Sequence, residues 1–83
     1  MTVHELKCWP GPFAAVLNGT KRYEIRSTAD RHFAIGDVLV LHEWVPQPGV
    51  YTGRSLKKTV SYLTAPGEFG LPENLCVMSL EAR

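Results

Sequence analysis

The chain has 83 residues, of which 45% are hydrophobic and 20% are charged, and its net charge is only +1. We expect one small globular domain over residues 1–83 with a modest core. The weak charge argues against a protein that grips duplex nucleic acid through many phosphates. No apolar run approaches the ~20 residues that span a bilayer, and the N-terminus lacks a secretory signal pattern. We therefore expect a cytoplasmic protein without a membrane partner.

Five strands and one helix are predicted along the chain. The strands are expected at residues 2–9, 22–26, 37–45, 54–63 and 74–81, and the helix at 11–18. The helix is indicated by proline in its first turn, by the spacing of Phe13, Val16 and Leu17, and by the stop at Asn18-Gly19. These elements predict a mainly β (α+β) domain whose five-stranded sheet curls into a small barrel, because closure removes strand edges.

The strand predicted at 22–26 carries the densest charge of the chain. Tyr23 and Ile25 alternate with Glu24 and Arg26, so we expect the two apolar side chains to pack and the two charged ones to share the other face. Lys21 precedes the strand, directly after the helix stop. Such a cluster of both signs is either an ion-pair clasp or a polar binding pocket.

The two cysteines, Cys8 and Cys76, fall in the first and last predicted strands. Both are expected to be free and buried, because a disulfide is not needed in a reducing compartment and small thiols are common in cores. Neither belongs to a CxxC or His/Cys spacing typical of zinc sites. We expect no metal and no organic cofactor.

Lys21, Glu24 and Arg26 are the leading candidates for a binding site. Lys21 can hold a phosphate or a base carbonyl as a point charge, Glu24 can accept from a base amino group, and Arg26 can contact a carbonyl or a phosphate in bidentate fashion. The alternative is a solvated lysine beside an exposed ion pair, which would contribute about 0–1 kcal/mol.

Further candidates come from other elements. Lys7 and Trp9 share one face of the first strand, where Lys7 could add a second cation and Trp9 could stack a base. His4 lies on the opposite, apolar face, as a core histidine or as a hydrogen-bonding group at the strand end. Asp37 is expected to cap its turn, and Arg54 is a possible phosphate contact.

Four motifs in this order resemble the DUF3850 family, which is part of the ASCH superfamily with its PUA-like fold. They are His4-Glu5-Leu6-Lys7-x-Trp9-Pro10, Gly19-x-Lys21-x-x-Glu24-x-Arg26, Phe33-x-x-Gly36-Asp37-x-Leu39 and Tyr51-Thr52-Gly53-Arg54. The resemblance covers nearly the whole chain. It implies a small PUA-like β-barrel whose helix and second strand border a cleft.

The resemblance also implies a function. ASCH domains are generally RNA-binding or nucleotide-binding modules, so the expected partner is single-stranded RNA, a nucleotide or a nucleoside, bound by a monomer or weak dimer. The alternative is an enzyme, because related groups look like N4-acetylcytidine amidohydrolases or ribonucleases. Lys21 and Glu24 would then be the acid/base pair. Glu24 stands where the amidohydrolase pattern has its nucleophilic Thr, so we expect little hydrolysis of acetylcytidine.

Overall fold

A computed structural model describes residues 1–83, which form a single five-stranded sheet with one helix. The elements are β1 (Val3–Cys8), α1 (Pro10–Leu17), β2 (Tyr23–Ser27), β3 (Val38–Val45), β4 (Val50–Thr64), the 3-10 turn η1 (Glu68–Gly70) and β5 (Leu75–Ala82). The sheet order is β1-β3-β4-β5-β2. β1 and β3 are parallel, and the other neighbours are antiparallel. No helix is long and apolar enough to cross a membrane.

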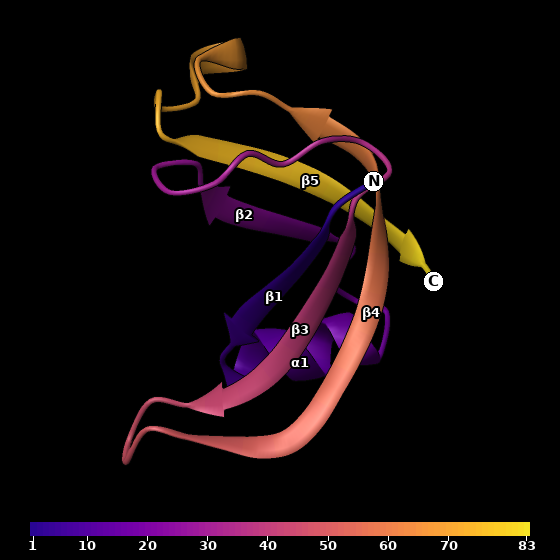
Figure 1. The fold of residues 1–83 in the computed structure, drawn as a ribbon, viewed down its shortest axis with the longest axis vertical. Helices are drawn as coiled ribbons and strands as arrows, with labels where there is room; N and C mark the ends of the chain where they lie inside the picture. Colours follow the sequence, from indigo (N-terminus) through magenta and orange to yellow (C-terminus); the bar gives the residue numbers. More distant parts are fainter.

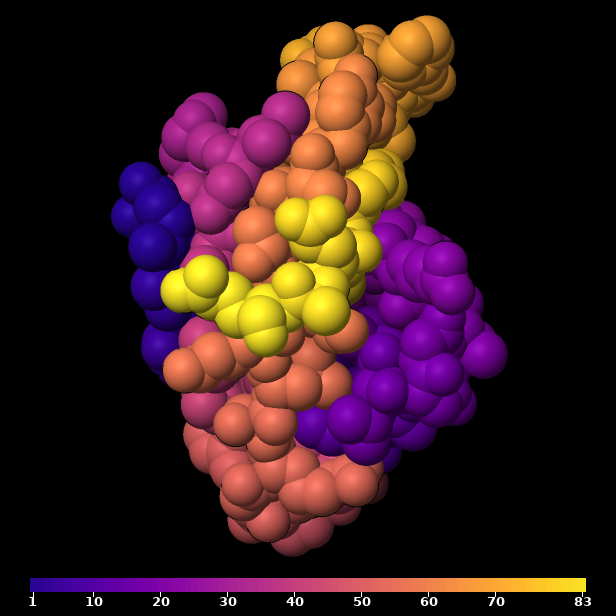
Figure 2. Space-filling model, turned by 90° about the vertical axis from the view of Figure 1, so that its right-hand side faces the viewer, coloured from indigo at the N-terminus to yellow at the C-terminus, as the bar shows by residue number.

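The mainly β architecture with one early helix is confirmed. The sheet curls into a half-barrel, and its two end strands, β1 and β2, are not paired with each other (Figure 1). Long β4 connects the two parts of the sheet, since it pairs with β3 over its first half and with β5 over its second. In Figure 2, β5 crosses the middle of the visible face, between the N-terminal residues on one side and the segment containing β2 on the other.

The prediction for the fourth strand was too short at its start. β4 begins at Val50, which pairs with Val45 of β3, whereas the sequence predicts a strand only from Arg54. The hairpin loop is therefore confined to residues 46–49. Gly49 takes a positive φ of 102° there, a conformation that glycine adopts without a steric penalty.

The core lies between the curled sheet and α1. Phe13 and Val16 from α1 pack with the inward side chains of the strands, among them Leu39, Leu41 and Met78. The proline in the first turn and the left-handed glycine after the last turn limit α1 to eight residues. This short helix covers one end of the sheet's concave face, and β1 runs directly into it, so the end of β1 lies beside the start of α1.

The face expected to be buried on β2 is the exposed one. Tyr23 and Ile25 are 45% and 52% exposed, whereas Glu24 is only 3% exposed. The reason is the register on β5, where Glu24 lies opposite the fully buried Met78 and Ile25 lies opposite Val77. Because directly paired residues point to the same side of a sheet, the buried face of β5 determines which face of β2 is buried.

His4 and Asp37 form a buried polar pair at the end of the sheet where β1 begins. The Asp37 carboxylate is 2.8 Å from His4 Nε2 and accepts hydrogen bonds from the amides of Thr2 and Ala34. Burial acts to raise the pKa of Asp37. The hydrogen bonds with His4, Thr2 and Ala34 outweigh this effect and hold the pKa below its ordinary value. Asp37 thus caps its turn, as expected, and joins the N-terminus to that turn.

We predict that Asp37→Asn lowers the free energy of unfolding by about 1.5–3 kcal/mol near pH 7, the range for hydrogen bonds to a charged group. Because the pKa of Asp37 is lower in the folded state, the wild-type advantage is complete above the ordinary carboxyl pKa of about 4 and is lost as the pH falls through the folded value. Urea denaturation at pH 7 and pH 3 measures both effects.

Asp30→Asn is the matched control, because Asp30 is exposed. It should change stability by less than about 0.5 kcal/mol. A difference between wild type and Asp37→Asn that stays constant from pH 7 to pH 3 would contradict the assigned role.

Candidate functional site

Lys21, Glu24 and Arg26 meet around the Glu24 carboxylate. Lys21 Nζ lies 2.8 Å from Glu24 Oε1, and Arg26 Nε lies 2.9 Å from Oε2. The alternation of β2 places Glu24 and Arg26 on the same face, and the stop after α1 places Lys21 beside them. Each carboxylate oxygen therefore accepts a hydrogen bond from a different cation.

Both cations also hold backbone carbonyls. Lys21 Nζ donates to the carbonyl of Tyr23 at 2.8 Å, within its own segment. Arg26 Nη2 donates to the carbonyl of Lys7 at 2.9 Å. The second bond crosses from β2 to β1, the two strands at opposite ends of the sheet order, so Arg26 connects the two edges that the backbone ladder leaves unpaired.

A pocket of about 360 Å³ opens at this seam between β1 and β2. The charged cluster forms one part of its lining, together with Lys7. The end of β1 and the first turn of α1 form the rest, through Cys8, Trp9 and Pro12. The exposed face of β2 adds Tyr23 and Ile25. The pocket therefore lies beside the start of α1, although the sequence motif places its charged residues after the end of that helix.

The pocket combines cations with aromatic surface. Lys7, Lys21 and Arg26 line it, against the single carboxylate of Glu24. Trp9 is 60% exposed, so its ring is accessible to a ligand. Three cations against one carboxylate give the lining a surplus of two positive charges, whereas the chain as a whole carries only +1. Such a pocket favours an anionic ligand with a flat, polar ring.

Cys8 is the one thiol in the pocket lining. Burial raises the pKa of the Cys8 thiol, and the carboxylate of Glu24 raises it further. The thiol therefore stays protonated near neutral pH and is a poor nucleophile. Cys8 and Cys76 are both free and buried.

His4 and Arg54, the two other candidate residues, lie outside the pocket. His4 packs against Phe33, with ring centroids 4.5 Å apart, and pairs with Asp37. Arg54 lies over the ring of Phe13 at 5.0 Å and pairs with Glu43. The structure thus brings together Lys7, Trp9, Lys21, Glu24 and Arg26, and it places the histidine and the second arginine in separate polar contacts.

Glu43 is a buried polar residue that the sequence analysis did not single out. Its carboxylate accepts from Arg54 Nε at 3.0 Å and from Thr52 Oγ1 at 2.7 Å. These hydrogen bonds hold the pKa of Glu43 below its ordinary value, and the one from Arg54 has the largest effect. The Tyr51-Thr52-Gly53-Arg54 motif was the signal in the sequence that could have pointed to Glu43, because it supplies both donors. No group of three or more His, Cys, Asp or Glu side chains is placed to hold a metal ion.

Two comparisons with known proteins bear on this chain. A protein of Escherichia phage P2, described as an uncharacterized 12.9 kDa protein in the GpA 3' region, is 44% identical over 62 residues. That match covers 75% of this chain and 54% of the phage protein, so the chain spans about half the length of this relative. A family model described as "Domain of unknown function (DUF3850)" matches residues 3–80, which include the whole pocket lining. The chain belongs to the DUF3850 family.

Proposed function

We propose that the pocket between β1 and β2 binds a nucleotide or a short single-stranded RNA. The observation that carries this proposal is the Glu24 carboxylate, which lines an open pocket while Lys21 and Arg26 hold it in place. A fixed carboxylate with adjacent cations can recognise the polar edge of a base and the phosphate next to it.

The individual groups suit the parts of a nucleotide. A carboxylate has about four lone-pair sites, so Glu24, which is only 3% exposed and lies in the wall of the pocket, keeps acceptor sites for a base amino group in addition to its two cations. The guanidinium of Arg26 uses Nε and one N–H of Nη2 within the protein, and its remaining N–H groups can meet a phosphate. Trp9 offers an exposed ring on which a base can stack. The low net charge favours a short ligand over a duplex.

We predict that Lys21→Gln and Arg26→Gln each weaken the binding of a nucleoside monophosphate or a short RNA by about 1–3 kcal/mol, the value of one good polar contact. Isothermal titration against the four nucleoside monophosphates and short single-stranded RNAs measures the change. Circular dichroism of each variant establishes that the protein is folded at the temperature of the titration.

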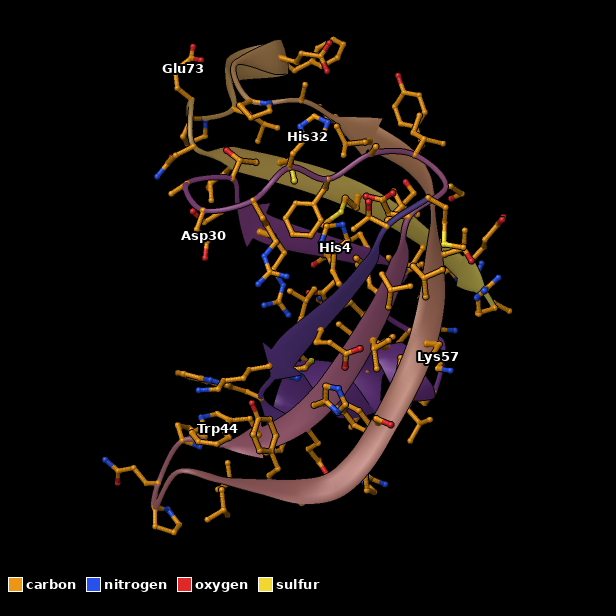
Figure 3. All side chains as sticks on the ribbon, in the orientation of Figure 1. His4, Asp30, His32, Trp44, Lys57 and Glu73 are labelled. Carbon is orange, nitrogen blue, oxygen red and sulfur yellow. The ribbon has the colours of Figure 1, made fainter.

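Lys57→Gln is the control for the loss of one positive charge. Lys57 is exposed on β4 (Figure 3), the central strand of the sheet order, and does not line the pocket, which lies between the end strands β1 and β2. It should leave binding nearly unchanged at moderate salt, where distant exposed charges are screened. Equal binding by wild type and both pocket variants would overturn the proposal.

An ion-pair clasp without a ligand remains the competing interpretation, because the three charged groups hydrogen-bond one another. In both interpretations Lys21, Glu24 and Arg26 stabilise the folded protein jointly, so their contributions to the free energy of unfolding depend on one another. We predict that Arg26→Gln alone costs about 1–3 kcal/mol, because it leaves a buried carboxylate with one cation. The double variant Arg26→Gln/Glu24→Gln should recover part of this loss, giving a coupling of about 0.5–3 kcal/mol in urea denaturation.

Additive effects of these two substitutions would contradict the structural role of the pair. Loss of stability without loss of ligand binding would support the clasp over the binding site. The two measurements therefore separate what the cluster does for the fold from what it does for a ligand.

We also predict little or no hydrolysis of N4-acetylcytidine. No serine or threonine lines the pocket, and the hydroxyl of Thr20 donates to Asn18 Oδ1 at 2.8 Å. Both oxygens of Glu24 already accept hydrogen bonds from cations, so a water molecule would have to compete with Lys21 and Arg26 for them. Chromatography of acetylcytidine after incubation with the protein measures turnover. Efficient turnover that Glu24→Gln abolishes would favour the enzyme.

A further inference from the structure

We propose that the ligand of the pocket is a single strand of several nucleotides, which continues across Lys7 and Arg26 into a second hollow on the outer face of β1 and β3. This inference rests on the proposed function of the pocket. The second hollow measures about 330 Å³, and its lining includes Glu5, Arg31, His42 and Tyr51. Lys7 and Arg26 line both hollows, so the two cations lie at the boundary between them.

The charges of the second hollow favour an anionic chain. Arg31 adds a third cation beside Lys7 and Arg26. The one carboxylate in the hollow, Glu5, has its Oε1 at 2.5 Å from His42 Nε2, and the three cations outnumber it. A phosphate that joins two nucleotides could therefore lie at Lys7 and Arg26, and the next phosphate could lie towards Arg31.

The second hollow also has an aromatic platform. Tyr51 is 55% exposed. Trp44 packs edge-on against it with ring centroids 4.7 Å apart, and His42 does so at 6.0 Å. Lys7 Nζ lies 4.0 Å from the centre of the Trp44 ring, so the aromatic group and the boundary cation support each other. Figure 3 shows Trp44 on the side of the molecule where the ends of β1 and β2 lie.

The order of these groups along the surface matches a single strand of nucleic acid. Exposed Trp9 lies in the first pocket, the two shared cations come next, and Tyr51 with Arg31 follows in the second hollow. Alternating stacking surfaces and cations are typical of proteins that bind single strands with little sequence preference. An acidic peptide would use the cations but would leave both aromatic surfaces without a flat partner. RNA and single-stranded DNA both carry the phosphates and flat bases that these cations and aromatic side chains would bind.

Fluorescence anisotropy tests the inference with wild-type protein, labelled six-nucleotide RNA and DNA strands, and a nucleoside monophosphate as unlabelled competitor. We expect either hexanucleotide to bind at least tenfold more tightly than the monophosphate. Arg31→Gln and Tyr51→Leu should each weaken hexanucleotide binding about tenfold and leave the monophosphate affinity unchanged. Arg31→Gln should also reduce the slope of log K against log salt by about 0.7.

Lys57→Gln is again the charge control and should change none of these values by more than about twofold. A hexanucleotide that binds no more tightly than the monophosphate would overturn this inference and leave the proposed function intact. Unchanged hexanucleotide binding by both Arg31→Gln and Tyr51→Leu would also overturn it, as would a hexaglutamate peptide that binds as tightly as the hexanucleotide. If neither the monophosphate nor a hexanucleotide binds to wild-type protein, the proposed function itself fails. If the hexanucleotides bind as expected, a preference for RNA over DNA, or the reverse, would show which of the two nucleic acids is the ligand.

Discussion

Glu24 is a carboxylate that faces the interior of a small curled sheet, and the arrangement around it depends on two cations. Lys21 and Arg26 each bond to one of its oxygens. An unpaired buried carboxylate would cost several kcal/mol, so the position of Glu24 requires that both side chains reach it. Arg26 reaches further, to the Lys7 carbonyl on β1. One guanidinium therefore neutralises the carboxylate and links the two ends of the sheet.

The open seam of the half-barrel explains why polar groups collect there. Edge strands carry backbone groups without partners, and proteins satisfy or protect them with side chains. Between β1 and β2 a side chain takes this role, and a hydrogen-bonded ladder would leave no room for a pocket. The space beside Arg26 is accessible to a ligand because the sheet does not close. Stability and candidate binding chemistry consequently share the same residues, and a substitution at Arg26 should affect both.

The protein has two other buried carboxylates with hydrogen-bond donors around them, Asp37 and Glu43. Asp37 takes two backbone amides and His4 at one end of the sheet, and Glu43 takes Thr52 and Arg54 on β4. In both cases the donors surround the carboxylate, and neither carboxylate lines one of the hollows described above. What distinguishes Glu24 is the open space next to its pair of cations.

Local signals in the chain were enough to predict the helix, the approximate positions of the strands and the clustering of Lys21, Glu24 and Arg26. Helix stops and side-chain alternation depend on neighbouring residues, so they can be read without knowing the fold. The direction in which Glu24 points could not be read this way. Tyr23 and Ile25 looked like the packed face of β2, but pairing with β5 across more than fifty residues turned that face outward. The same limit applied to His4 and Arg54, because the partner of His4 is Asp37, in the turn before β3, and the partner of Arg54 is Glu43, on the paired strand β3. Residue types and spacing along the chain identified the charged motif, and only the tertiary register decided that it faces a pocket, because the buried side of a strand is chosen by the strand beside it.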